Sequence, residues 1–263
     1  MLPYLTIGDF QLPLYGLVSV IGFLLAVVVC ITLTKKYNVN RWDLIFASFF
    51  CAMGVLIGAK ILYFLTTLPR IIEHFDVFKK NIYYMFIYGF SGFVFYGGLI
   101  GGAIGVVLYC KFFKVKLGPI MTITAPGIPL MHSFGRVACF LSGCCYGKEY
   151  HGPFAVTYPM SSDIKGLGGV ERFPTQLTEA AFDFVLFIIL FIYVKKKNPP
   201  EGRALGIYIT AYTIERFFLE FLRGDAIRGI FFGLSTSQWI SLLLLPLGIY
   251  LIQKKEQNKE SSH

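Results

Sequence analysis

The chain has 263 residues, of which 56% are apolar and 15% charged, and its mean hydropathy is +0.65. A soluble domain of this size cannot bury so much apolar surface, so the composition predicts an integral membrane protein. In a soluble protein, the formal net charge of +9 would favour binding to nucleic acid. Here the lysines cluster beside apolar stretches, where anionic lipid headgroups account for them, and we expect no nucleic-acid partner.

Seven apolar stretches have the length and the flanking charges of membrane-spanning helices. They cover residues 14–33, 44–65, 93–113, a fourth stretch that starts near 119, and then 175–194, 204–222 and 237–252. Pro126 and Pro129 lie inside the fourth stretch and predict a bend there. The sequence thus predicts an all-α integral membrane protein with seven transmembrane helices, in which residues 1–263 form a single transmembrane domain.

Two segments are too polar to cross the bilayer. Residues 66–90 mix charged and apolar side chains, which is typical of an arm on the membrane surface. Residues 148–174 are rich in Gly, Ser and Pro and predict a small extracytoplasmic head. Basic residues flank the helix ends unequally, with thirteen on the side that holds the C-terminus and eight on the other. The positive-inside rule therefore places the N-terminus outside and the C-terminus in the cytoplasm.

The stretch HSFGRVACFLSGCCYG, residues 132–147, brings a guanidinium, an imidazole and three thiols to the end of an apolar helix. His132, Arg136 and Cys139 fall at i, i+4 and i+7, so a helix presents them on one face. Ionisable groups inside a membrane are costly and are functional by default, which predicts a site. Alternatively, Arg136 could snorkel to the interface and His132 could be a satisfied core side chain.

A second polar face is predicted in the stretch 204–222, where Arg216, Glu220 and Arg223 share the same spacing. One arginine can pair with the glutamate and leave the other guanidinium to bind an anion. Together with Arg136, this predicts a phosphate site, because a guanidinium fork matches phosphate oxygens and a phospholipid headgroup is the anion at hand. A salt-bridge network that only fixes helix packing is the alternative.

The cysteines leave two interpretations open. Adjacent Cys144 and Cys145 could form only a strained disulfide, which is the labile kind used in redox chemistry. With His132 and Cys139 they could also approach a metal ion, but the H-x6-C-x4-C-C spacing matches no zinc pattern. We therefore predict no metal and no cofactor.

Several separated motifs, in order along the chain, resemble the bacterial prolipoprotein diacylglyceryl transferase family. Leu14-Tyr15-Gly16-Leu17 is similar to its first-helix signature, and Tyr96-Gly97-Gly98-Leu99 to its His-Gly-Gly segment. Gly135-Arg136-Val-Ala-Cys139-Phe140 with Gly147 is similar to its Gly-Arg-x-x-Asn-Phe-to-Gly signature. Pro174-Thr-Gln176-Leu-x-Glu179 and Arg216-x-x-x-Glu220-x-x-Arg223 are similar to two further elements.

The resemblance implies a multi-pass enzyme of the bacterial inner membrane. It would move a diacylglyceryl group from phosphatidylglycerol to the cysteine thiol of a lipoprotein precursor. Membrane lipid would surround the enzyme. Arg136 and Arg216 would correspond to the family's lipid-binding and second essential arginines, and Tyr96 occupies the place of its histidine. The residues expected to contact substrate are Tyr15, Lys60, Gly97, Gly98, Arg136, Cys139, Cys144, Gly147, Glu220 and Arg223.

The chain departs from the family motifs at four positions. Tyr96 replaces a histidine, Cys139 an asparagine, Cys144 an acid and Lys60 an arginine of the second helix. His132, which the usual motif lacks, could supply the missing imidazole as a catalytic group. Two other functions stay open on the same scaffold, a thiol redox protein that uses Cys139, Cys144 and Cys145, and a non-catalytic lipid-binding protein.

Overall fold

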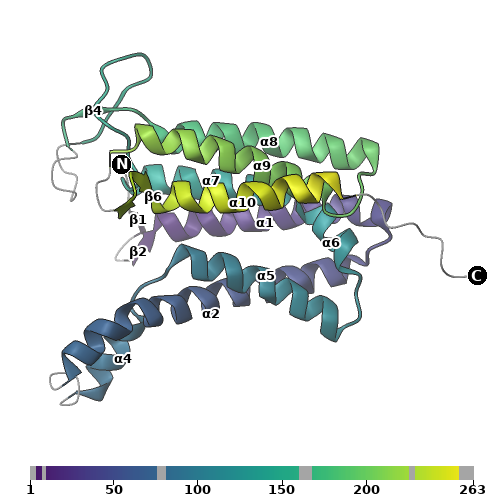
Figure 1. Ribbon diagram of the computed structural model, residues 1–263, viewed down its shortest axis with the longest axis horizontal. Helices are drawn as coiled ribbons and strands as arrows, with labels where there is room; N and C mark the ends of the chain where they lie inside the picture. Colours follow the sequence, from purple (N-terminus) through teal and green to yellow (C-terminus); the bar gives the residue numbers. More distant parts are fainter. Residues whose placement is uncertain (1–3, 8–9, 76–80, 160–167, 225–228, 255–263) are drawn as a thin grey trace, which may run out of the picture. The chain divides into compact units, whose positions relative to one another are not determined.

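The computed structural model describes residues 4–7, 10–75, 81–159, 168–224 and 229–254. The chain is mostly helical in this part and divides into two compact units (Figure 1). The first unit contains Met1–Tyr37 and Gly118–His263, and the second contains Asn38–Leu117. The prediction of a helical membrane protein is confirmed at this level.

Five helices in the described part are long and apolar enough to cross a membrane. They are α1 (Leu14–Thr34) with its 3-10 extension η1 (Lys35–Tyr37), α2 (Arg41–Glu73), α5 (Phe95–Phe112), α8 (Thr175–Lys197) and α10 (Thr236–Gln253). Two shorter helices, α7 (Gly127–Leu141) and α9 (Arg203–Leu219), fall at the other positions where spans were predicted. After α9 the chain continues as the 3-10 turn η2 (Glu220–Leu222).

The first unit is a bundle in which α1 packs on α7, α7 on α8, α8 on α9 and α9 on α10 (Figure 1). Helix α1 illustrates the pattern. Gly22, Ala26 and Cys30 recur every four residues on its buried face, whereas the large side chains of Val20 and Leu24 are exposed. An exposed apolar face of this kind suits hydrocarbon rather than water.

The predicted fourth helix differs from expectation because it is broken rather than bent. Helix α6 (Leu117–Thr124) ends with the Ala125 amide donating to the Met121 carbonyl, and α7 begins after Pro126. Proline has no backbone N–H and clashes with the preceding turn, so α6 ends before Pro126 and a new helix begins after it. Pro129 is tolerated inside α7 because it lies in the first turn.

In the second unit, α2 and α5 approach closely through glycines. A Cβ atom added to Gly54 would lie 2.2 Å from the Gly101 carbonyl oxygen, and one added to Gly97 would lie 2.3 Å from the Gly58 carbonyl oxygen. This is the small-residue packing predicted for glycine-rich membrane helices. Helix α4 (Ile82–Phe90) packs on α2, which itself runs on to Glu73 and so into the predicted surface arm.

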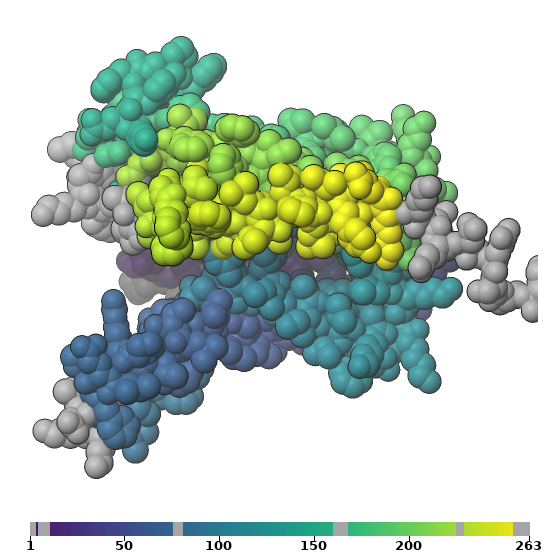
Figure 2. Space-filling model, in the orientation of Figure 1, coloured from purple at the N-terminus to yellow at the C-terminus, as the bar shows by residue number. Residues whose placement is uncertain are grey.

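The described residues also form three two-stranded antiparallel sheets, which were not predicted. They are formed by β1 (Tyr4–Ile7) with β2 (Phe10–Pro13), β3 (Val156–Thr157) with β4 (Glu171–Arg172), and β5 (Ile230–Phe231) with β6 (Leu234–Ser235). Strands β3 and β4 belong to the predicted head, which Figure 2 shows as a teal lobe at one end of the helices of the first unit.

Parts of three predictions lie outside the described residues. They are residues 76–80 of the arm, residues 160–167 of the head, and six of the basic residues counted for orientation, namely Lys79, Lys80, Lys165, Arg228, Lys255 and Lys259.

Candidate functional site

A buried carboxylate on α8 is the centre of the polar cluster in the first unit. The Glu179 side chain is only 1% exposed. Arg136 Nη2, from α7, lies 2.7 Å from Glu179 Oε1, and Arg216 Nη1, from α9, lies 3.8 Å from Glu179 Oε2. The two arginines that the sequence singled out therefore meet across one carboxylate. A buried charge is tolerated in apolar surroundings only when it is paired in this way.

His132 lies one turn before Arg136, and Asp183 lies one turn after Glu179. The His132 Nδ1 atom is 3.1 Å from Asp183 Oδ2, and its Nε2 atom is 3.7 Å from Glu179 Oε1. Residues four apart share a helix face, so two basic groups on α7 face two acidic groups on α8. The Tyr208 hydroxyl, 3.3 Å from His132 Nδ1, closes the cluster from α9.

The predicted helical face of Arg216, Glu220 and Arg223 is formed only in part. Helix α9 ends at Leu219, Glu220 begins η2, and Arg223 is extended after that turn. Arg216 Nη2 lies 2.5 Å from Glu220 Oε2 and donates to the Ser237 hydroxyl at 3.3 Å. Arg223 Nε lies 3.9 Å from Glu220 Oε2. Arg216 thus bridges two carboxylates, Glu179 and Glu220, and both arginines of the motif lie near an acid.

Two guanidinium nitrogens of the cluster are buried without a hydrogen-bond partner in the described part of the chain. They are Arg136 Nε and Arg216 Nη1. Buried donors are almost always satisfied in folded proteins, so such atoms call for an explanation. An anion with several acceptor oxygens would satisfy both.

The three thiols of the central motif meet at the end of α7. Their sulfur atoms all lie within 4.8 Å of one another. Cys139 is buried, whereas Cys144 and Cys145 are partly exposed, and all six cysteines of the chain, each within the described residues, are free thiols. Hydrogen bonds from the Cys139 and Cys144 thiols, together with the nearby Arg223 guanidinium, lower the pKa of Cys145.

The thiols meet because of how α7 ends. Gly143 takes a positive φ of 72°, its amide donates to the Phe140 carbonyl, and the Cys144 amide donates to the Cys139 carbonyl at 3.1 Å. This is the Schellman arrangement, in which a left-handed residue after the helix folds the chain back over its last turn. Cys144 is thereby placed beside Cys139.

The other predicted site residues divide between the two units. Tyr15 lies close enough to Arg136 and the three cysteines to interact with them electrostatically. Gly147 is held by backbone pairing with Arg223, and a Cβ atom there would lie 2.3 Å from the Phe173 carbonyl oxygen. The remaining predicted residues belong to the second unit and are Lys60, Tyr96, Gly97 and Gly98.

In the second unit, the Lys60 ammonium donates to the Phe90 carbonyl at 2.5 Å and lies 3.9 Å from the centre of the Phe93 ring. Gly97 and Gly98 are buried against α2. The structure therefore gives both glycines a packing role, since a side chain at either position would meet α2.

The sequence interpretation missed the acidic half of the cluster. Glu179 belongs to one of the family motifs, and no sequence pattern assigned a role to Asp183, Glu215, Tyr208 or Tyr212. The Tyr212 hydroxyl donates to Glu179 Oε1 at 3.3 Å, and the Glu215 carboxylate is buried with no hydrogen-bond partner among the described residues. A signal was available, since Glu179 and Asp183 are two acids four apart at the start of an apolar stretch.

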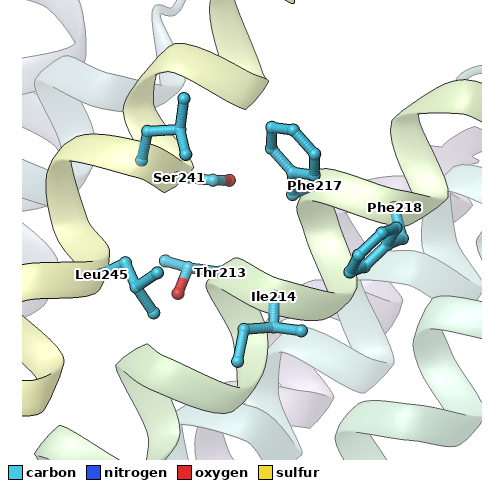
Figure 3. A pocket seen from close by; sticks show the side chains of 7 residues that line it. Thr213, Ile214, Phe217, Phe218, Ser241 and Leu245 are labelled. Atoms are coloured by element: carbon cyan, nitrogen blue, oxygen red, sulfur yellow. The ribbon is translucent and has the colours of Figure 1, made fainter.

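An apolar hollow of about 200 Å³ opens between α9 and α10 beside this cluster (Figure 3). The hydroxyls of Thr213 and Ser241 at its wall donate to carbonyls of their own helices, so the hollow presents mainly carbon. Its lining consists of Thr213, Ile214, Phe217, Phe218, Ser241, Leu242 and Leu245. Arg216 lies one turn along α9 from Thr213.

A paired arginine and carboxylate cluster, buried between apolar helices with unsatisfied cationic donors, defines a membrane protein with a polar intramembrane site. Comparison with known proteins identifies the family. The model of the family described as prolipoprotein diacylglyceryl transferase matches residues 3–253. The chain belongs to the prolipoprotein diacylglyceryl transferase family.

Individual relatives match over nearly the same length. The phosphatidylglycerol–prolipoprotein diacylglyceryl transferase of Clostridium tetani is 35% identical over 237 residues, which is 90% of each chain. The transferase numbered 2 of Clostridium perfringens is 34% identical over 249 residues, covering 94% of this chain and 93% of the relative. The Idiomarina loihiensis enzyme is 29% identical over 253 residues, covering 95% and 91%.

Proposed function

We propose that this chain transfers a diacylglyceryl group from phosphatidylglycerol to the cysteine thiol of a lipoprotein precursor, in the bacterial inner membrane. In this reaction the sulfur forms a bond to the diacylglyceryl carbon, the bond from that carbon to the phosphate oxygen breaks, and glycerol phosphate leaves. The negative charge on the leaving phosphate increases during the reaction, so the enzyme needs cations placed beside it.

The single observation that carries the proposal is the pair of buried guanidinium donors on Arg136 and Arg216. A phosphate diester offers the acceptor oxygens that Arg136 Nε and Arg216 Nη1 lack in the described structure. Both arginines are already oriented by Glu179, which reduces the reorganisation needed when the phosphate binds. The apolar hollow beside Arg216 is suited to hydrocarbon, as expected for a substrate that carries acyl chains.

His132 has the surroundings of a proton acceptor for the attacking thiol. Its Nδ1 atom lies 3.1 Å from Asp183, and a carboxylate in that position fixes the orientation of an imidazole. Tyr96 is proposed as a further catalytic group. Proposed substrate contacts are Tyr15, Lys60, Gly97, Gly98, Cys139, Cys144, Gly147, Glu220 and Arg223.

The number of membrane spans and their orientation are also part of the proposal. Residues 1–263 form one transmembrane domain with seven spans, in which α7 and α9 complete the five longer helices, and residues 66–90 and 148–174 form the surface arm and the extracytoplasmic head. The N-terminus lies outside, because the basic residues concentrate at the other helix ends. A reporter fused after Lys255 should therefore give a cytoplasmic signal, and a periplasmic signal from that fusion would refute the orientation.

Complementation of a conditional deletion of the host transferase tests the assignment of the arginines. The wild-type chain should restore lipoprotein maturation, whereas Arg136→Ala and Arg216→Ala should fail while still accumulating in the membrane. Arg203→Ala is the matched control, because Arg203 begins the helix whose last turn contains Arg216, and its guanidinium donates to the Ile252 carbonyl, away from the cluster. Full complementation by both site variants would refute the phosphate role.

A further inference from the structure

The spacing of the cysteines in the sequence predicted no metal, but the structure brings the thiols of Cys139, Cys144 and Cys145 together in an arrangement that could hold an ion. Their sulfur atoms lie within 4.8 Å of one another, and sulfurs bound to one tetrahedral zinc ion are about 3.8 Å apart, since each Zn–S bond is about 2.3 Å long. A contraction of about 1 Å would bring all three into coordination distance of one ion.

The backbone around these thiols is fixed by neighbouring elements. The Schellman turn sets Cys144 over Cys139 through the hydrogen bond between their main chains. From the start of α8, the Thr175 hydroxyl donates to the Cys145 carbonyl at 2.8 Å, and the Gln176 amide donates to the Cys144 carbonyl at 2.7 Å. Thiols on a turn that is held in this way lose little further freedom when an ion binds.

The charge of the surroundings suits three thiolates and a divalent ion. Three thiolates and one Zn²⁺ carry a net charge of about −1, which needs compensation in an apolar setting. Arg136 interacts electrostatically with Cys139 and Cys145, and Arg223 does so with Cys145. The two guanidinium groups therefore provide positive charge close to the sulfur atoms, which offsets the net negative charge of an occupied site.

We propose that Cys139, Cys144 and Cys145 hold a thiophilic divalent cation, Zn²⁺, whose fourth coordination position receives the acceptor cysteine of the lipoprotein precursor. Three protein ligands and one open position are the arrangement of catalytic rather than structural zinc sites. Cys139 forms the buried floor of the site, and the partly exposed Cys144 and Cys145 leave it accessible. The role of the open position rests on the proposed transferase function.

The chemistry balances without an oxidant. When the acceptor thiol binds the ion, its proton passes to His132, the proton acceptor proposed above, and the sulfur becomes a thiolate. The sulfur then attacks the diacylglyceryl carbon, the carbon–oxygen bond to phosphate breaks, and the phosphate leaves with the electron pair. The neutral thioether that results is a weaker ligand than the thiolate and dissociates from the ion.

Metal content and Co²⁺ spectroscopy test the site without relying on activity. The full-length protein, purified without chelator, should contain about one zinc per chain, as expected for one such site. Cys139→Ser and Cys144→Ser should lose it, while Cys51→Ser, a partly exposed cysteine in α2, should keep it. Co²⁺ added to metal-free wild-type protein should give a thiolate charge-transfer band. This measurement uses no variant, so it holds even where a variant fails to fold.

An acceptor peptide separates the role of the open position from metal binding. A peptide with the precursor cysteine should change the Co²⁺ ligand-field spectrum, and the same peptide with serine should not. Wild-type protein with no zinc and no Co²⁺ band, or with a disulfide within the three cysteines, would overturn the site. Undiminished transfer by metal-free enzyme would overturn its catalytic use and leave the transferase function intact. Metal binding without transfer would instead refute the proposed function alone.

Discussion

At the scale of single residues, Glu179 organises the site. It faces Arg136, Arg216 and His132 at 2.7, 3.8 and 3.7 Å, and it accepts a hydrogen bond from Tyr212. One buried carboxylate therefore holds basic groups from two helices in fixed positions. The same contact that stabilises the bundle also keeps the cations oriented for an incoming phosphate, so packing and function are linked through this side chain.

Glu179→Gln should lower both stability and transfer. The glutamine keeps the shape but removes the charge that compensates Arg136 and Arg216, and breaking a buried ion pair costs about 3–5 kcal/mol. Thermal unfolding in detergent, followed by circular dichroism, measures the loss. The control is Glu171→Gln, because Glu171 pairs with His151 at 2.8 Å but is half-exposed in the head. A Glu179 variant as stable as this control would contradict the central position of the carboxylate.

At the scale of elements, helix packing follows from where glycine occurs. In the second unit, α2 and α5 approach so closely that glycine carbonyl oxygens occupy the space that Cβ atoms would need. Close contact of this kind replaces the hydrophobic effect, which does not drive helices together within a bilayer. In the first unit, α9 and α10 also approach through glycines, since a Cβ atom added to Gly206 would lie 2.8 Å from the Gly248 carbonyl oxygen. Side chains that include Leu186, Leu190 and Tyr208 form a core in the same unit.

Gly54→Ala should destabilise the protein, whereas Gly16→Ala should not. The new methyl at position 54 would lie 2.2 Å from the Gly101 carbonyl oxygen, and relieving such an overlap costs about 1–3 kcal/mol. A Cβ atom added to Gly16 would have no neighbouring atom within 4 Å, and alanine has a higher helix propensity than glycine. The midpoints of thermal unfolding compare the two. Equal midpoints would mean that α2 and α5 are less tightly packed than described.

The sequence predicted the features that depend on the spacing of nearby residues and on the length of apolar stretches. The spacing of His132, Arg136 and Cys139 placed them on one face, and the length of the apolar stretches predicted most of the helices. The four-residue spacing of Glu179 and Asp183 indicates two acids on one face of α8. No local pattern specifies that this face packs against α7, so the basic partners of these acids were not predicted. The three thiols were singled out together from the sequence, but the turn at Gly143 that brings their sulfur atoms within 4.8 Å of one another was not predicted.

At the scale of the whole molecule, the chain is a multi-pass membrane protein whose polar cluster lies in the first of two compact units. The exposed surface of its helices is largely apolar, and the charged groups around Glu179 are buried between the helices, which is the reverse of a soluble protein. A site that binds a charged headgroup within such a scaffold must provide its own counter-charges, and the arginines supply them.

The most direct test of this account is transfer by the purified wild-type chain. The protein is reconstituted in phosphatidylglycerol vesicles with a precursor peptide that carries the acceptor cysteine, and the peptide mass is measured over time. The mass should increase by one diacylglyceryl group, with release of glycerol phosphate, and the serine version of the peptide should stay unchanged. An unmodified cysteine peptide, with folded protein and with Zn²⁺ supplied, would contradict the assignment of this chain as a diacylglyceryl transferase.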